Sequence, residues 1–354
     1  MSRFFSEKYK DLVPYTPGEQ PKDTVYIKLN TNESPFPPST RAQMCAQKAL
    51  CDLQLYPDPT CAGLNAKIAE TIGVEPDEIL VTNGSDDILN FAFMAYCDKN
   101  TPAVFADITY GFYNVFAKAN GIPYEELKLN EDFSINLEEY KNIGKTVFIA
   151  NPNAPTGIAI PRDELEKVIA ANPNNVVVID EAYVDFGAES CVPLIHKYDN
   201  LLVTQTFSKS RSMAGARLGF GVGNKELIRD LNTLKYSTNP YNINRATMAA
   251  GIGVLEDEEY TQRNCKTIIE NREFTTSELK KLGFVMTDSK TNFVFAKHPD
   301  VSGIEIYKKL REKGILVRHF DKPGISDYNR ITIGSIEQMT ELVTALKQIL
   351  EEVK

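Results

Sequence analysis

The 354-residue sequence contains no tryptophan and only three histidines, His196, His298 and His319. None of these histidines stands in an H-E-x-x-H arrangement, which argues against a metal centre built from histidines. The six cysteines are scattered without a C-x-x-C pair. This pattern predicts the reduced thiols of a cytoplasmic protein, and neither a disulfide framework nor a zinc site.

Long apolar runs and long blocks of like charge are also missing. No run reaches the length of a membrane span, and the first residues, MSRFFSEKYKDL, lack the hydrophobic core of a signal peptide. The 39 basic and 48 acidic residues give a net charge of −9 that is spread along the chain. This balance argues against nucleic acid or an anionic membrane as the main partner.

Short apolar segments alternate with helical patterns from about residue 79 onward. Segments that are apolar at consecutive positions and separated by helices predict a parallel sheet covered on both faces. In such sheets, ligands bind at the carboxyl ends of the strands. The predicted strands are EILVT, PAVFAD, KTVFIA, VVVID, LLVTQ and RLGFGVG.

A chain of this length predicts two domains. The sequence patterns divide the whole chain into an arm and these two domains. Residues 1–40 are rich in proline and turn residues and are expected to form an arm that joins the small domain. Residues 41–254 are expected to form the large domain. Residues 255–354 begin with a long polar helical pattern, which would link the domains, and continue as a small α+β domain.

One stretch, TFSKSRSMAGARLGF, carries the most chemistry. It places Lys209 after a strand, among the hydroxyls of Thr206 and Ser208 and close to Arg211 and Arg217. Nearby cations favour the free amine that covalent lysine chemistry needs, and hydroxyls with an arginine suit a phosphate. Taken alone, a solvated surface lysine is the simpler interpretation. Arg211 is expected to be structural.

Two residues near the end of the strand VVVID suit a ring ligand. Asp180 closes the strand, where a buried carboxylate is costly unless it meets a charged partner such as a protonated pyridine nitrogen. A helix N-cap is an equally good interpretation of Asp180. Tyr183 offers a phenol for a ring hydroxyl, although a lone tyrosine more often packs in a core.

Three other motifs suggest binding groups. NGSDD, at a strand-to-helix turn, suits an anion at free helix amides or a plain N-cap at Ser85. Tyr110, in TYGFY, could stack on a planar ring or belong to the core. Arg318 and Arg330 stand on predicted strands and could grip a substrate carboxylate or phosphate, or form surface salt bridges.

These groups together match the needs of one cofactor. Pyridoxal 5'-phosphate requires an amine for its aldehyde, a carboxylate for its ring nitrogen, ring contacts and phosphate donors. The sequence places all of them at predicted strand ends of one sheet. The combination is more specific than any of its parts taken alone.

The chain also resembles a known family over essentially its full length. The motifs LNTNESPFPPS, YPDPT, NGSDD, TYGFY, NPNAPTG, DEAYVDF, TFSKSRSMAGARLGF, NPYNIN and NRITIG occur in the order found in the fold-type I, class I/II pyridoxal-phosphate aminotransferases. Among these they are most similar to the histidinol-phosphate aminotransferases. The resemblance implies an α/β fold with a mostly parallel seven-stranded sheet between helices, and a small α+β domain.

The resemblance further implies the reaction and the assembly. L-Histidinol phosphate and 2-oxoglutarate would give imidazole acetol phosphate and L-glutamate, in histidine biosynthesis, on a cytoplasmic homodimer. Rival activities on the same scaffold are an aromatic amino-acid aminotransferase and a threonine-phosphate decarboxylase. A non-enzymatic pyridoxal-phosphate-binding regulator is disfavoured, because no DNA-binding extension accompanies the motifs.

The resemblance also assigns roles to residues. Lys209 would form the Schiff base with the cofactor, Asp180 would pair with the ring nitrogen, Tyr183 would contact the ring hydroxyl and Tyr110 would stack on the ring. The phosphate would be held by Gly84, Ser85, Asp86, Thr206, Ser208, Arg217 and the partner subunit's Tyr56. The substrate would be bound by Tyr15, Arg318 and Arg330.

One position departs from the family pattern. The family usually has NNPTG, in which the asparagine before Pro-Thr-Gly bonds the ring hydroxyl, whereas this chain has Ala154 there and Asn153 one position earlier. We expect Asn153 or a water molecule to substitute, or Tyr183 to make the contact alone. One lost hydrogen bond of this kind costs about 1–3 kcal/mol.

Overall fold

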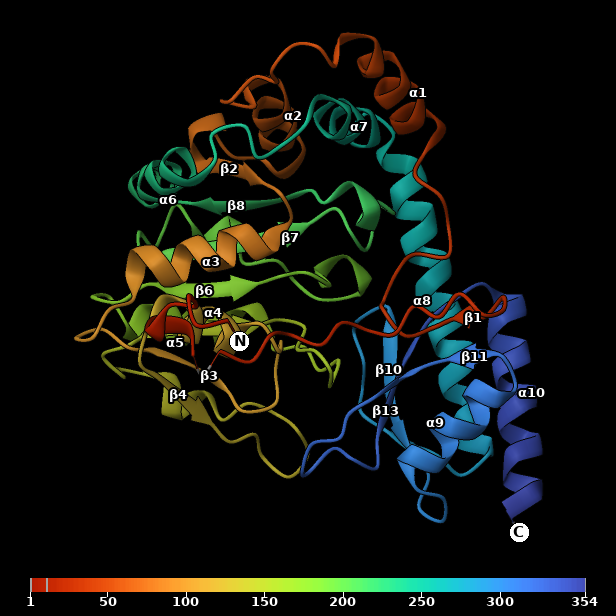
Figure 1. Cartoon of the computed structure of the whole chain (residues 1–354). Coiled ribbons are helices and arrows are strands. Elements are labelled where there is room, and N and C mark those ends of the chain that lie inside the picture. The colour runs from red at the N-terminus through yellow and green to blue at the C-terminus, as the bar shows by residue number, and fades with distance from the viewer. Residues whose placement is uncertain (1, 11, 354) are drawn as a thin grey trace.

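The computed structural model describes residues 2–10 and 12–353. Figure 1 shows a larger α/β body around a seven-stranded sheet and a smaller body around a four-stranded sheet. Helix α8 (Glu258–Lys281) runs from one body to the other. The N-terminal segment passes along both bodies before it enters α1.

The large sheet has the strand order β2-β8-β7-β6-β5-β3-β4. Strand β8 is antiparallel to both of its neighbours and the other pairs are parallel, so the mostly parallel seven-stranded sheet is confirmed. Six of these strands follow from the sequence pattern. The edge strand β4 was not predicted, because Glu125 and Glu126 leave it only partly apolar. The strands are β2 (Ile79–Thr82), β3 (Ala103–Ala106), β4 (Tyr124–Leu127), β5 (Thr146–Ala150), β6 (Val177–Asp180), β7 (Leu201–Thr206) and β8 (Gly219–Gly223).

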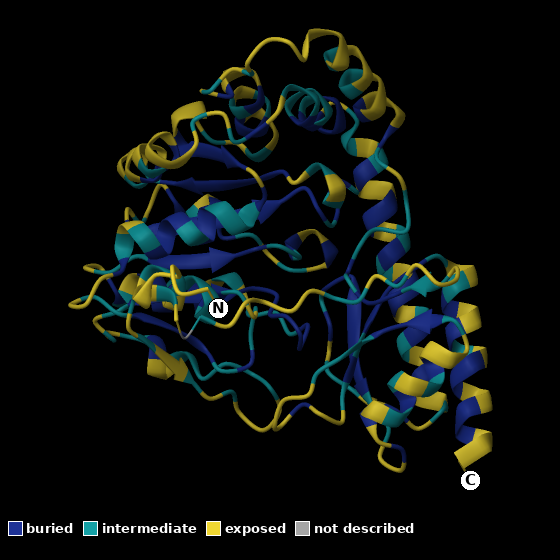
Figure 2. Ribbon diagram, in the orientation of Figure 1, coloured by how far each residue is buried: buried dark blue, intermediate teal, exposed yellow. Residues whose placement is uncertain are grey.

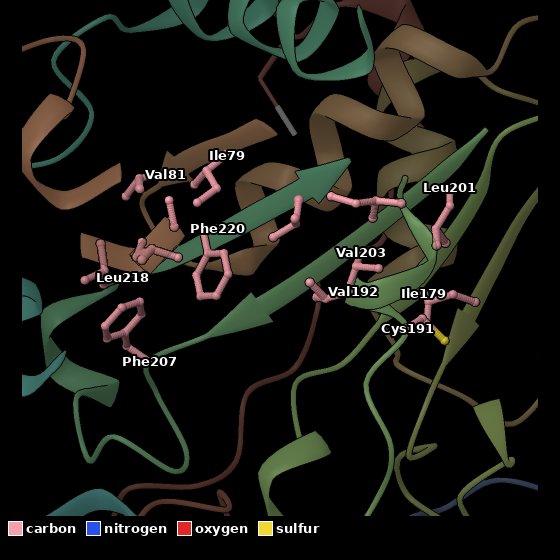
Figure 3. Close-up of a cluster of buried hydrophobic side chains, with 14 of the residues drawn as sticks. Ile79, Val81, Ile179, Cys191, Val192, Leu201, Val203, Phe207, Leu218 and Phe220 are labelled. Carbon is pink, nitrogen blue, oxygen red and sulfur yellow. The ribbon is translucent and has the colours of Figure 1, made fainter. Parts of the chain in front are cut away.

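Successive residues of each central strand face opposite sides of the sheet, and both sides are buried (Figure 2). Val178 packs with helices α3, α4 and α6, whereas Ile179 packs with α2, α5 and α7. Figure 3 shows Ile179 with Val203, Phe220 and Ile79 on the second side. The helices are α1 (Thr40–Ala49), α2 (Ala62–Ile72), α3 (Ser85–Tyr96), α4 (Tyr113–Asn120), α5 (Arg162–Ala171), α6 (Lys225–Thr238) and α7 (Arg245–Leu255).

Polar residues in the sequence determine where several helices begin. The side chains of Ser39, Asn224, Asn244 and Ser302 each accept a hydrogen bond from a backbone N–H in the first turn of the helix that follows. Each cap satisfies one of the amide groups that a helix start leaves free. The α6 and α7 caps lie in segments for which the sequence pattern gave no helix prediction.

The small body has its own core and its own sheet. Its antiparallel strands have the order β12-β13-β10-β9, and α8, α9 and α10 supply apolar side chains to the same core. A parallel pair of strands, β1 and β11, joins the N-terminal segment to this body. The elements are β1 (Ile27–Lys28), β9 (Val285–Met286), β10 (Phe293–Lys297), α9 (Gly303–Glu312), β11 (Ile315–Leu316), β12 (Arg318–His319), β13 (Asn329–Thr332) and α10 (Ile336–Val353).

Three features of residues 2–10 and 12–353 bear on function. No helix in this part of the chain is long and apolar enough to cross a membrane. No group of three or more His, Cys, Asp or Glu side chains in the same residues is arranged to hold a metal ion. All six cysteines are described, and each is free.

Candidate active site

A cavity opens at the carboxyl ends of β5, β6 and β7. It encloses about 580 Å³, part of which is open to solvent, and it adjoins a larger hollow of about 1770 Å³. The two spaces share Tyr110, Ala154, Tyr183 and Lys209. The smaller cavity is lined by Ser85, Asp86, Tyr110, Ala150, Pro152, Ala154, Asp180, Ala182, Tyr183, Thr206, Ser208, Lys209 and Arg217. Strand-end motifs that are far apart in the sequence therefore meet here.

Lys209 lies between the two spaces, on the loop that connects β7 to β8. Its Nζ donates to the backbone carbonyl of Thr31 at 3.4 Å and lies 5.9 Å from the centre of the Tyr183 ring. Among the described residues, no carboxylate lies within 4.0 Å of the Lys209 Nζ. The amine is thus held only by a long hydrogen bond and is free to react with a group in the cavity.

Asp180 forms the floor of the smaller cavity and is 5% exposed. Its Oδ2 accepts a hydrogen bond from the Tyr113 phenol at 3.0 Å, and its Oδ1 accepts from the Ala182 N–H at 3.3 Å. Burial raises the pKa of Asp180 to about 6, although the Tyr113 bond opposes the rise. A protonated ring nitrogen in the cavity would supply the positive charge that this carboxylate lacks.

The N-terminus of α3 and Arg217 form the opposite end of this cavity. Arg217 contacts Asp86 at 3.1 Å and Ser208 Oγ at 3.5 Å, and the Thr206 hydroxyl donates to Ser208 Oγ at 3.0 Å. Ser85 and Asp86 occupy the first turn of α3, where the backbone amides have no helical partners. Free amides, hydroxyls and a guanidinium in one place suit a phosphate group.

Two glycines make this arrangement possible. Gly84 has φ +90°, and a Cβ there would lie 2.6 Å from Arg217 Nη2. A Cβ on Gly219 would lie 2.2 Å from the backbone nitrogen of Ser85. Only glycine at both positions therefore allows β8 and Arg217 to approach the start of α3 so closely.

Tyr110 and Tyr183 lie on the walls of the cavity. The Tyr110 phenol donates to Asp86 Oδ1 at 2.7 Å, which fixes its ring beside the phosphate end. The Tyr183 phenol accepts from Asn32 Nδ2 at 2.9 Å, and its ring packs edge-on against Phe293. Both rings are thus held in place and present a surface to a ligand.

The larger hollow contains the residues expected to bind substrate. Arg318 and Arg330 are directly paired across β12 and β13, so the two arginines do come together. Arg330 Nη2 donates to Asn30 O at 3.2 Å, while its buried Nε has no hydrogen-bond partner among the described residues. Arg318 donates to Thr16 O and Pro17 O, and Tyr15 stacks on Phe112 at 4.2 Å. The unpartnered Arg330 Nε is a donor available for an anion.

Three expected cofactor residues do not line the smaller cavity, and one of them, Gly84, directly precedes the lining residue Ser85. Asn153 is buried and its amide is fully engaged, because Oδ1 accepts from the Thr109 hydroxyl while Nδ2 donates to Ile108 O and Thr156 Oγ1. It cannot replace the asparagine missing at Ala154. Tyr56 is 77% exposed and stacks on Tyr241 at the surface, away from its own chain's cavity.

Two residues that contact this site were not singled out from the sequence. Tyr113 belongs to the same TYGFY motif as Tyr110, yet it is the one that bonds Asp180. Asn32 lies in the LNTNESPFPPS segment, far from the other motifs in the chain, and reaches Tyr183. The turn-rich composition around Asn32 indicates an ordered segment, but it does not predict which part of the protein this segment contacts.

Arg211 also contacts the loop that carries Lys209, from the side away from the cavity. Its buried guanidinium pairs with Asp185 at 3.3 Å and lies over the Phe207 ring, and Asp185 also accepts a hydrogen bond from the Ser210 hydroxyl. These contacts join the Lys209 loop to the DEAYVDF segment that carries Asp180 and Tyr183. They are consistent with a structural role.

Comparisons with known proteins agree with this geometry. A family model described as aminotransferase class I and II matches residues 24–346. The chain is 48% identical over 351 residues to a Clostridium beijerinckii protein named histidinol-phosphate aminotransferase, with 99% of this chain and 98% of that protein covered. It is 47% identical over 353 residues to a Brachyspira hyodysenteriae protein of the same name, with 99% and 100% covered.

A solved structure shares the fold. The crystal structure of histidinol-phosphate aminotransferase from Sinorhizobium meliloti in complex with pyridoxal-5'-phosphate is similar with a TM-score of 0.91 at 22% identity, covering 100% of this chain and 99% of that chain. This likeness supports the fold. The match to the family model over most of the chain and the nearly full-length relatives show that the chain belongs to the class I and II aminotransferases.

Proposed function

We propose that this chain is a pyridoxal-5'-phosphate-dependent aminotransferase that moves the amino group of L-histidinol phosphate to 2-oxoglutarate. The observation that carries the proposal is the meeting of three groups in one cavity. These are the Lys209 amine, the buried Asp180 carboxylate and the anion site at the start of α3 with Arg217. The nearly full-length relatives that carry the name histidinol-phosphate aminotransferase support this activity.

The residues of the cavity fit the cofactor. When bound, pyridoxal 5'-phosphate supplies an aldehyde that reacts with amines and a ring that accepts electrons. The Lys209 amine would react with the aldehyde, Asp180 would hold a proton on the ring nitrogen, and Tyr183 would donate to the ring oxygen. The amides of Ser85 and Asp86, with Arg217, Thr206 and Ser208, would hold the phosphate. Asn153 is left out of this set because its amide is engaged elsewhere.

Lys209 would have a second role when substrate is bound. Its amine would take the proton from the substrate carbon that bears the nitrogen and pass it, on the same face, to the cofactor carbon that was the aldehyde carbon. The Thr31 carbonyl accepts the hydrogen bond that holds Nζ in the absence of a ligand. Tyr15 lines the larger hollow, where substrate would bind.

Arg330 is the proposed main anion contact of the substrate. Burial lowers its pKa, but a guanidinium remains charged at any physiological pH. The phosphate of L-histidinol phosphate would bond the free Nε, and Arg318 would add donors. In the second half of the reaction a carboxylate of 2-oxoglutarate would occupy the same site.

We further propose a cytoplasmic homodimer. Tyr56 points away from its own cavity and lies among other exposed apolar side chains, including Leu50, Leu53 and Leu55. A second copy packed on this surface would bring the partner subunit's Tyr56 to the phosphate. The division into an arm (1–40), a large domain (41–254) and a linking helix with small domain (255–354) is also a proposal, supported by the separate cores of the two bodies.

The proposal is tested by chemical trapping together with kinetics. Borohydride reduction of the protein with bound cofactor should attach the cofactor to the Lys209 peptide, and attachment to Lys235 or another lysine would refute the assignment. Lys209→Ala should abolish turnover. Initial rates with 2-oxoglutarate should give a higher kcat/KM for L-histidinol phosphate than for phenylalanine, without decarboxylation of threonine phosphate. A preference for phenylalanine would refute the substrate.

A further inference from the structure

Asn32 occupies an unusual position between the two bodies of the molecule. Its backbone is in the left-handed region, with φ +55°, and the residue is 1% exposed. Few residues other than glycine adopt this conformation, and asparagine is among the more tolerant ones. Its side chain lies between Tyr183, on the wall of the cavity, and Thr332, on β13 of the small body.

Two hydrogen bonds to Thr332 determine which way the Asn32 amide points. The backbone N–H of Asn32 donates to Thr332 Oγ1 at 2.9 Å, so this hydroxyl acts as an acceptor for that bond and keeps its own hydrogen for another partner. The partner is Asn32 Oδ1, at 3.1 Å. With its oxygen engaged by Thr332, the amide directs its nitrogen toward Tyr183, and Nδ2 donates to the phenol oxygen at 2.9 Å.

We infer that Asn32, held by Thr332, is a positioning residue that directs the Tyr183 phenol hydrogen toward the ring oxygen of the bound cofactor. Because the phenol oxygen accepts from Asn32, its one hydrogen is left to donate elsewhere. The ring of Tyr183 is held edge-on by Phe293, at 5.2 Å and 90°, so the phenol stays at the cavity wall. The inference rests on the proposed function.

This arrangement offers an answer to the missing asparagine at Ala154. Alanine has no donor, and Asn153 is engaged with Thr109, Ile108 and Thr156. The ring oxygen would then depend on Tyr183 for a side-chain donor from this part of the cavity wall. Asn32, in the arm, orients the phenol of Tyr183 and thereby the hydrogen bond that Tyr183 would donate to the ring oxygen.

The same contacts couple the phenol to the substrate site. Thr332 and Arg330 are on the same short strand, β13, and Asn292 Nδ2 of the small body donates to the Asn32 carbonyl at 2.9 Å. A shift of β13 when Arg330 binds an anion would therefore be transmitted through Thr332 and Asn32 to Tyr183. Substrate binding and the protonation of the cofactor are predicted to be linked through this chain of hydrogen bonds.

The test follows the visible absorption of the bound cofactor as a function of pH, without substrate. A hydrogen-bond donor stabilises the anionic ring oxygen and so favours the unprotonated form of the nitrogen that joins Lys209 to the cofactor. Loss of this donor therefore raises the apparent pKa of that nitrogen, which is read from the visible absorption. Tyr183→Phe should give the full upward shift. Asn32→Gly, which suits a positive φ, should give a smaller upward shift of about 0.3–1 pH unit. The double variant should match Tyr183→Phe alone.

Two further pairs of variants separate orientation from structure. Asn32→Asp keeps the shape but offers an acceptor to the phenol, so its shift should exceed that of Asn32→Gly. Thr332→Val should raise the apparent pKa, whereas Thr332→Ser, which keeps the hydroxyl, should have the apparent pKa of the wild-type protein. Asn271→Ala removes a comparable buried bond, to Gly334 O at 3.0 Å, and should lower the melting temperature without moving the titration.

The outcomes are distinct. The inference would be overturned by an unchanged titration in Asn32→Gly or in Thr332→Val. It would also be overturned if the shifts of Asn32→Gly and Tyr183→Phe added in the double variant. Should Asn32→Gly fail to fold, the Thr332 pair decides. A wild-type protein that shows no cofactor absorption, or no trapping on Lys209, would instead refute the proposed function.

Discussion

Gly84→Ala should weaken cofactor binding through a steric effect that can be read directly from the structure. The added methyl group would lie 2.6 Å from Arg217 Nη2 and 3.2 Å from its Cζ, well inside van der Waals contact. The guanidinium is the mobile end of a side chain, so it would move away and leave the backbone of α3 nearly in place. In moving, it would leave the phosphate end of the cavity.

The magnitude follows from the contact that is lost. A hydrogen bond between charged groups contributes about 1.5–3 kcal/mol, which corresponds to about a 10- to 150-fold change in affinity. Alanine at φ +90° and ψ +161°, a conformation that is essentially restricted to glycine, also costs folding stability, on the order of 1–3 kcal/mol, but that cost is shared by the free and the bound protein. We therefore expect the dissociation constant of pyridoxal 5'-phosphate to rise about 10- to 150-fold.

The dissociation constant can be measured by titrating cofactor-free protein and following visible absorption. Gly73→Ala is the matched control, because Gly73 lies at the end of α2 with φ +75°, and a methyl group added there would have no heavy atom within 4 Å. It should also lower stability, by about 1–2 kcal/mol for alanine in the left-handed region, and leave cofactor affinity unchanged. An unchanged affinity in Gly84→Ala, or an equal loss in both variants, would refute the steric argument.

Two other predictions concern stability. Burial raises the pKa of Asp180 to about 6, above the ordinary value of about 4, so the folded cofactor-free protein binds this proton more tightly than the unfolded chain. Its stability should fall as pH rises from about 4 to about 6, by up to about 3 kcal/mol, and urea unfolding should show a smaller fall in Asp180→Asn; an identical pH dependence would contradict this. Arg211→Met removes a buried guanidinium from Asp185 and Ser210 and should lower the free energy of unfolding by about 1–3 kcal/mol, whereas Arg229→Met, at an exposed pair, should have a much smaller effect. Equal effects would contradict the role of the buried contact.

The residues at strand ends were predictable because a parallel sheet brings such ends to one edge. Asp180 and Lys209 follow buried apolar runs, so their meeting needs only the topology rule for ligand sites. Arg318 and Arg330 were also placed on strands, and they proved to be direct cross-strand neighbours. In each case the local pattern and the tertiary position agree.

Other features depend on contacts that no local pattern records. The run RLGFGVG identifies a strand but not its direction. Strand β8 is antiparallel to β7 because no α-helix lies between them to carry the chain back to the other end of the sheet. Tyr110 and Tyr113 look equivalent in TYGFY, and only the start of α4 turns the second one inward toward Asp180. The sequence places Asn153 next to the position where the family has its ligand-binding asparagine, but in the fold its amide is engaged by Thr109 and Thr156.

The pairing of the N-terminal segment with the small body has a consequence for the order in which a newly made chain becomes active. All seven strands of the large sheet have been synthesised by Gly223, whereas Asn32 must wait for Thr332, a residue 300 positions away. At about 5–20 residues per second, the intervening stretch of about 110 residues takes roughly 5–20 seconds to translate. The large sheet can therefore form on the ribosome before the arm has its final partner, and the phenol of Tyr183 is oriented only after Thr332 has been synthesised.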